Sequence, residues 1–291
     1  MVEILLIILL LFILAPIIVI LIGGFFNAVG AIFSFIFKSS FIVLFVVCIF
    51  TLFTISMKLF SEYYLYIFPP FLTMIVFTFI FGNVAKLPSE GDAPYALMVF
   101  AALLPWQFFS GALTEASTSL LSNANLVSKV YFPRMIIPIS AVITTFIDFL
   151  ISLFILIMLM VYYQFIPPFQ ILLLPIFMFL VFLTSFGAGL FFSALNVKYR
   201  DFRYVIPFIV QMGLYVSPVG FSSSIVPEKY ELLYYLNPLV GIIDGFRWCI
   251  LGGESNLNHY ALIFSSSITF LLLFLSIKYF RNVEKAFADH I

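Results

Sequence analysis

Two carboxylates stand inside long apolar stretches of this sequence, where ionisable side chains are costly and often functional. Glu115 has hydroxyl side chains beside it, and Asp148 lies within the apolar stretch 135–163. Proton relays and ion-coupled carriers usually place more acidic or histidine groups near the membrane midplane. The two carboxylates therefore favour an ion-coupled carrier only weakly, and a hydrogen bond from each to a neighbouring helix is the plainer interpretation.

The sequence lacks the motifs of several large enzyme classes. It contains no G-x-x-x-x-G-K-[ST] loop for ATP, no H-E-x-x-H zinc motif and no G-x-S-x-G nucleophile. His259 and His290 are far apart, so we expect no metal site. The small residues of Gly187–Gly189 lie within an apolar stretch, where they favour close helix packing.

The composition indicates an all-α integral membrane protein. Of the 291 residues 64% are hydrophobic and 9% are charged, whereas a soluble domain has roughly 45–50% and 25%. Six stretches are long and apolar enough to cross a bilayer. They are residues 60–82, 95–120, 135–163, 170–195, 204–221 and 257–278. The 13 Lys and Arg residues are spread thinly, which argues against a nucleic-acid partner.

Basic residues predict the orientation of these spans. Eight Lys and Arg residues fall in 121–134, 196–203 and the C-terminal tail, against three in the alternate connections. The positive-inside rule therefore predicts that these three segments, and the C-terminus, are cytoplasmic. The long segment 222–256 then faces outward.

Segment 222–256 has the pattern of two short helices rather than a loop or a span. Pro227 can begin the first, and the pair Asn237–Pro238 separates it from an apolar second piece that is too short to cross. We therefore predict two re-entrant helices on the outer side. Asp244 and Arg247 are three residues apart on the second, where they can pair.

Aromatic residues make up 20% of the chain and gather in the early spans. Many of them must face lipid or the interface. An aromatic wall can also hold the slightly positive C–H faces of sugar rings, because the aromatic face is negative. Trp106, Phe108 and Phe109, with Glu115 further along the same span, are thus candidates for lining a substrate passage.

Several ordered motifs make residues of about 69–285 resemble a known family. The stretches are Pro70–Gly82, Ala85–Gly91, Leu103–Phe109, Asn123–Arg134, Ala194–Tyr204, Ser217–Val219, Leu236–Pro238 and Gly245–Trp248. Together they resemble the membrane (permease) subunit of ABC-type polysaccharide or polyol-phosphate exporters, which export O-antigen, capsule or teichoic acid in bacteria.

The resemblance implies a multi-pass homodimer in the bacterial cytoplasmic (inner) membrane, paired with separate ABC ATPase subunits. ATP and Mg would bind the partner, so no cofactor is expected in this chain, and the substrate would be a lipid-linked glycan. It also implies that cytoplasmic residues dock into the ATPase and couple its motion to transport. These are Asn123, Asn125, Lys129, Tyr131, Pro133 and Arg134, with a second contact at Tyr199, Arg200 and Asp201.

The beginning of the chain departs from the family. Residues 59–291 form the predicted six-span permease domain, but residues 1–58 are an atypical apolar N-terminal extension instead of a basic amphipathic helix. The extension is either a set of extra spans or a misjoined piece, and we favour the second. Two other functions stay open: a membrane-embedded glycan-modifying enzyme, for which we see no polar cluster at a membrane face, and an ion-coupled carrier.

Overall fold

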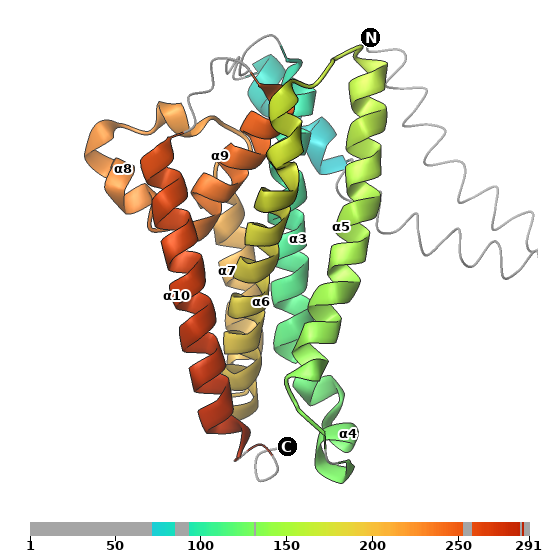
Figure 1. Ribbon diagram of the computed structural model, residues 1–291, viewed down its shortest axis with the longest axis vertical. Coiled ribbons are helices and arrows are strands. Elements are labelled where there is room, and N and C mark those ends of the chain that lie inside the picture. Colours follow the sequence, from blue (N-terminus) through green and yellow to red (C-terminus); the bar gives the residue numbers. More distant parts are fainter. Residues whose placement is uncertain (1–71, 85–92, 131, 253–257, 286, 288–291) are drawn as a thin grey trace, which may run out of the picture. The chain divides into compact units, whose positions relative to one another are not determined.

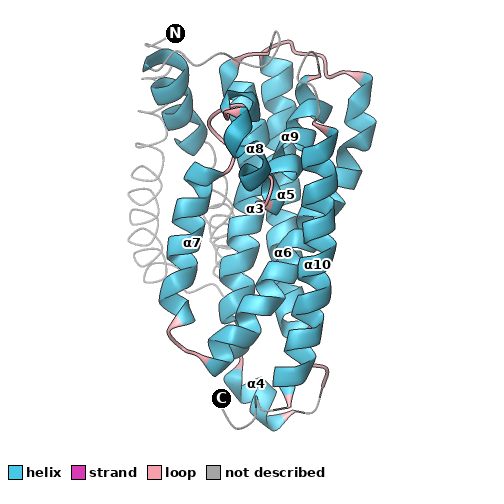
Figure 2. Ribbon diagram, turned by 90° about the vertical axis from the view of Figure 1, so that its left-hand side faces the viewer, coloured by secondary structure: helices cyan, strands magenta, loops and turns pink. Residues whose placement is uncertain are grey.

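The computed structural model describes residues 72–84, 93–130, 132–252, 258–285 and 287, all within one compact unit, Leu65–Ile291. The extension 1–58 lies outside these residues, so its nature stays a prediction. Throughout the described part the only regular elements are helices, which confirms the all-α class (Figures 1 and 2). Residues 72–77 form an α-helix that continues as the π-helix η1. The elements that follow are η1 (Thr78–Val84), α3 (Tyr95–Ser122), α4 (Ala124–Lys129), α5 (Ile136–Tyr162), η2 (Phe169–Leu173), α6 (Leu174–Lys198), α7 (Phe202–Val216), η3 (Ser223–Ile225), α8 (Glu228–Tyr234), α9 (Pro238–Leu251) and α10 (His259–Glu284).

Four helices are long and apolar enough to cross a membrane, which makes the chain a multi-pass membrane protein. They are α3, α5, α10 and the combined segment Phe169–Lys198. Two more predicted spans appear as shorter apolar helices, Leu72–Gly82 and Phe202–Val216. The 15 residues of α7 extend about 22 Å, less than the roughly 30 Å hydrocarbon core. Six complete spans therefore remain a prediction.

Helix α3 is the centre of the bundle (Figure 1). Most of its side chains are buried, because α5, α6, α7 and α9 all pack against it. Its contact with α6 is close: a Cβ added at Gly189 would lie 2.7 Å from Cβ of Ala116. A Cβ at Gly187 would lie 3.2 Å from the Leu273 Cα on α10. The small residues predicted to allow close packing thus do so on two sides of α6.

The two ends of the bundle carry different segments. α4, the end of α6 and the end of α10 meet at one end of the bundle through an apolar cluster, and Figure 1 shows α4 and the end of α10 there. Figure 2 shows α4 at the same end from another side. We call it the end cluster, and it consists of Leu120, Val127, Ile137, Leu190, Ala194, Val197, Phe280 and Phe287. α8 and α9 lie at the opposite end (Figure 1). The three basic segments of the sequence are therefore gathered at a single end.

Gly241 allows the closest approach of α9 to α10, and its substitution should separate them. A Cβ there would lie 2.5 Å from the Ala261 carbonyl oxygen, a backbone atom that a side-chain rotation cannot move. We expect Gly241→Ala to lower the free energy of unfolding by about 1–3 kcal/mol, measured as a lower midpoint of thermal unfolding in detergent. Gly111→Ala is the matched control, since its nearest neighbour would be 3.8 Å away. Equal midpoints for the two variants would contradict this packing.

Candidate functional site

Helix α3 keeps one polar face although most of its surface is buried. Ser110, Thr114, Thr118 and Ser122 are spaced four residues apart, so they form a row along the helix. Each hydroxyl donates to a backbone carbonyl of the preceding turn, for example Thr114 to Ser110 at 2.8 Å and Ser122 to Thr118 at 3.1 Å. Thr114 and Ser122 are exposed, and the other two are partly exposed. We call this row the α3 ladder.

Helix α5 carries a second row with the same spacing. It consists of Ser140, Thr144, Asp148 and Ser152, which we call the α5 ladder. The Thr144 hydroxyl donates to the Ser140 carbonyl at 3.0 Å, and the Ser152 hydroxyl to the Asp148 carbonyl at 3.0 Å. Helical spacing thus brings four polar groups to one stripe of an otherwise apolar helix.

The two ladders lie on the same side of the contact between α3 and α5. Gly111 faces Thr145, with 3.8 Å between a Cβ at Gly111 and the Thr145 Cγ2. The helices run antiparallel, and each residue turns the helix by about 100°. Both ladders are therefore displaced from the contact in the same direction. We call the surface that they form, together with Glu115, the polar face.

Neither intramembrane carboxylate of the polar face is paired within the described structure. Glu115 is exposed and Asp148 is partly buried, and no described residue donates a hydrogen bond to either side chain. The interpretation that each is bonded to a neighbouring helix is therefore wrong for the residues described. Their carboxyl groups are therefore left to interact with whatever meets this face.

The candidate aromatic residues are packed into the core of the subunit. Trp106 is buried with its ring against Gly213 of α7. Phe108 is also buried, and Phe109 is partly buried with its ring centroid 5.9 Å from that of Trp106. Phe108 packs with the rings of Phe146, Phe149 and Phe182. In this subunit these rings build the core that supports the polar face, and their contact with a substrate stays a prediction.

The predicted coupling segment forms the short helix α4 at the basic end. Asn123 links it to α3, because its side chain donates to the Ser119 carbonyl at 2.8 Å. Val127 is buried in the end cluster, whereas Asn125, Lys129 and Pro133 are exposed. Tyr131 lies outside the described residues. α4 thus has one anchored face and one free, partly basic face.

Arg134 is bound within its own chain. Its guanidinium donates to the Glu284 carbonyl at 2.6 Å and lies 5.9 Å from the Phe287 ring centroid. A cation at the end of α10 satisfies a terminal carbonyl and complements the helix dipole. Arg134 therefore fixes the start of α5 to the end of α10.

The second predicted contact is the exposed turn between α6 and α7. Tyr199, Arg200 and Asp201 are all exposed there, at the same end as α4. The Lys198 ammonium lies 5.2 Å from the Tyr199 ring centroid. Asp201 occupies the N-cap position of α7, although its side chain makes no capping hydrogen bond.

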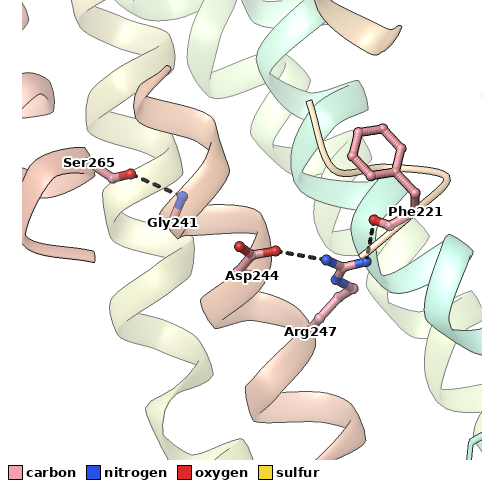
Figure 3. Close-up of polar contacts among 5 residues, drawn as sticks. All are labelled: Phe221, Gly241, Asp244, Arg247 and Ser265. Carbon is pink, nitrogen blue, oxygen red and sulfur yellow. Dashed lines mark hydrogen bonds and ion pairs between the residues drawn. The ribbon is translucent and has the colours of Figure 1, made fainter. Parts of the chain in front are cut away.

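Helix α9 carries a buried ion pair at the opposite end of the bundle. Arg247 is 1% exposed, and its guanidinium donates to Asp244 at 2.7 Å and to the Phe221 carbonyl at 3.0 Å (Figure 3). The pairing expected from their spacing is confirmed. The Gly241 backbone N–H donates to the Ser265 hydroxyl at 3.0 Å, which fixes α9 to α10 (Figure 3).

The turn after α7 is held by several other elements, which sequence reasoning missed. The Tyr95 hydroxyl at the start of α3 donates to the Gly220 carbonyl. Asn237 caps α9 by accepting from the Leu239 N–H, and it donates to the Ser217 hydroxyl at 3.0 Å. The motifs around Ser217 and Asn237 marked these residues, but no sequence signal joins two positions 20 residues apart.

Helix α8 is tied to α10 by a small polar network. Pro227 precedes α8 as predicted, and the Tyr235 hydroxyl after it donates to the Glu231 carboxylate. Asn258 caps α10 and donates to the same carboxylate at 2.9 Å and to the Tyr235 oxygen at 2.6 Å. Burial, together with the bond to Glu231, raises the pKa of Tyr235 above its ordinary value. Tyr235 therefore stays a neutral donor.

Comparisons with known proteins agree with this architecture. A family model for the ABC-2 type transporter matches residues 55–251. The chain is 27% identical over 221 residues to the O-antigen export system permease protein RfbA of Klebsiella pneumoniae, covering 76% of this chain and 83% of that protein. It is 23% identical over 224 residues to RfbA of Myxococcus xanthus, covering 76% and 85%. The polysialic acid transport protein KpsM of Escherichia coli is 22% identical over 218 residues, covering 73% and 82%.

Loss of Arg247 should remove the cation that lies 2.7 Å from the Asp244 carboxylate inside the protein. We expect Arg247→Met to cost about 3–5 kcal/mol of stability and Arg247→Met with Asp244→Asn to recover part of it, measured by thermal unfolding in detergent. Lys229→Met, at an exposed position on α8, should change stability by less than about 0.5 kcal/mol. Strictly additive effects of the two substitutions would contradict the pairing.

Proposed function

The chain belongs to the ABC-2 type transporter family, and on this premise we propose that it is the membrane subunit of an ATP-driven exporter. Its cargo would be a lipid-linked polysaccharide or polyol phosphate, moved outward across the bacterial cytoplasmic membrane. The observation that carries the proposal is the polar face on α3 and α5. The names of the O-antigen and polysialic acid relatives support a saccharide cargo.

The polar face does not suit contact with lipid. A carboxylate in hydrocarbon costs several kcal/mol, and Glu115 is exposed on the surface of this subunit. Such a face is stable when it meets water or a polar polymer. A second copy of the chain, placed opposite, would enclose a water-filled passage between two polar faces, which supports the homodimer.

The motor would be a separate subunit. The sequence has no P-loop, so in the proposed exporter ATP and Mg would bind to a partner subunit. α4 suits the docking of this partner because it presents exposed Asn125 and Lys129 while Val127 anchors it. The end cluster also contains residues of α3, α6 and α10, so a movement of α4 would be transmitted to several long helices.

In the proposed exporter, α8 and α9 would form the two re-entrant helices on the outer side of the membrane. They lie at the end opposite α4, which agrees with the charge bias of the sequence. Helix α9 is 14 residues long and almost wholly buried against α3, α6 and α10. A short buried helix that enters the bundle without crossing it fits the re-entrant form.

Charge reversal on α4 should uncouple the two subunits. We expect Lys129→Glu to reduce export and co-purification of the ATPase subunit at least several-fold, with an unchanged unfolding midpoint, because only an exposed side chain changes. Lys229→Glu makes the same substitution at the opposite end and should keep both. Glycan export in cells without any ATPase subunit, or export that stops when the proton gradient alone is collapsed, would refute the ATP-driven exporter.

The orientation of the bundle gives a separate test. Each reporter cysteine is introduced into a chain that also carries Cys48→Ser, and the variant is produced in spheroplasts. A membrane-impermeant maleimide should label Lys229→Cys on α8 in sealed spheroplasts. It should label Ser128→Cys on α4 only after the membrane is opened. Cys249 is buried and should contribute little background. Labelling of Ser128→Cys in sealed spheroplasts would place α4 outside and overturn the proposed ATPase contact.

A further inference from the structure

The polar face offers hydrogen-bond acceptors rather than donors. A serine or threonine hydroxyl has one proton to donate and two lone pairs that can accept. On the α3 ladder the protons are already used within the helix, at 3.0 Å from Ser110 to the Gln107 carbonyl and at 3.3 Å from Thr118 to the Thr114 carbonyl. The lone pairs of these oxygens remain for an outside partner.

The α5 ladder has the same character. The Ser140 hydroxyl donates to the Ile137 carbonyl at 2.8 Å, and Thr144 and Ser152 donate to carbonyls of the preceding turn. Glu115 and Asp148 add two carboxyl groups to this face, and a carboxyl group in its ionised form accepts hydrogen bonds and donates none. Neither α3 nor α5 contains a lysine, arginine or histidine. Apart from the partly exposed Gln107, whose neutral amide carries two donor protons, the side chains of the two ladders therefore offer acceptors.

We propose that the polar face selects an uncharged, hydroxyl-rich polysaccharide and disfavours polyanionic cargo. This inference rests on the proposed function and narrows its substrate class. A neutral sugar chain carries many hydroxyl protons, which the free lone pairs and carboxylates of the ladders can accept. A chain of carboxylates or phosphates lacks these donors at its charged groups and is repelled by Glu115.

A comparison of two cargoes tests the proposal. The full chain is produced with the same ATPase subunit in two bacterial strains that lack their own permease. One strain makes a lipid-linked neutral mannose homopolymer and the other makes lipid-linked polysialic acid. Polymer at the cell surface is measured relative to polymer retained inside. We expect export of the neutral polymer to exceed that of polysialic acid by at least about tenfold.

Variants of Glu115 test the cause of this selection. Glu115→Gln keeps the size of the side chain and removes its charge, and Glu115→Lys reverses it. We expect the preference for neutral polymer to fall at least several-fold in the order wild type, Gln, Lys. Glu115 is exposed, and size-exclusion chromatography of each complex checks that the variant assembles.

The hydroxyl oxygens are tested separately. Thr114→Val with Thr118→Val removes two acceptors from the polar face and should lower neutral-polymer export several-fold. Ser266→Ala is the matched control, because that hydroxyl also donates to its own helix, at 2.8 Å from the Leu262 carbonyl on α10. It should leave export unchanged.

The outcomes separate this inference from the proposed function. If the wild type exports both polymers equally, or if Glu115→Lys leaves the preference unaltered, the proposed selection of neutral cargo is wrong. The proposed export function is then still valid. Retention of both polymers inside cells, by a complex that assembles and hydrolyses ATP, overturns the proposed function itself.

Discussion

A polar side chain in hydrocarbon must find its hydrogen-bond partner inside the protein, and this requirement shapes the centre of the bundle. On α3 the hydroxyl protons are satisfied by the helix's own carbonyls, at a spacing of three or four residues. Their oxygens then project from a helix that is buried on its other sides. Because the hydroxyl protons are donated within the helix, α3 presents rows of hydroxyl oxygens that can accept hydrogen bonds. These rows lie beside the carboxyl group of Glu115, which has no partner among the described residues.

At the end of the bundle that carries α8 and α9, a buried charge is satisfied by bonds to another element. Arg247 is almost fully buried, and burying a charge is rarely a net gain in stability even when it is paired. Its bonds instead connect α9 to the turn after α7 through the Phe221 carbonyl. Tyr95 holds the neighbouring carbonyl of Gly220 from α3. The contribution of Arg247 is thus positional, since it holds the turn that follows α7, a helix whose buried residue is Ile206.

Much of the helical scaffold could be predicted from the sequence, because bilayer length and charged breaks leave few alternatives. The predicted stretches 95–120 and 135–163 agree with α3 and α5 to within a few residues. The pair Asp244–Arg247 followed from helical spacing. α7 ends at Val216, short of the predicted 221, because the chain turns at Ser217–Pro218. Hydropathy treats that turn as a continuation of the apolar run.

The candidate site was harder to predict, because it depends on which face each helix buries. Glu115 was singled out as an intramembrane charge, but nothing in the sequence shows that its face stays open while Phe108, seven residues earlier, is buried. The ladders have a visible period of four. However, the two ladders can be placed on the same side of the α3–α5 contact only when it is known that Gly111 faces Thr145. Arg134 shows the same limit, since charge bias cannot reveal that its guanidinium is already bound to Glu284.

Helix α10 provides the physical link between the two ends in the proposed exporter. Its last turn accepts the bond from Arg134 beside α4, and Ser265 near its beginning accepts the bond from the Gly241 N–H of α9. Its 26 residues extend about 39 Å as a helix that hydrogen bonds keep stiff along its axis. A force on α4 would therefore reach α9 through α10, in addition to the paths along α3, to which Asn123 joins α4, and along α5, which Arg134 joins to α10. The transmission of force would then use one helix outside the polar face and the two helices that form it, so motion driven from α4 would also move the surface that contacts the cargo.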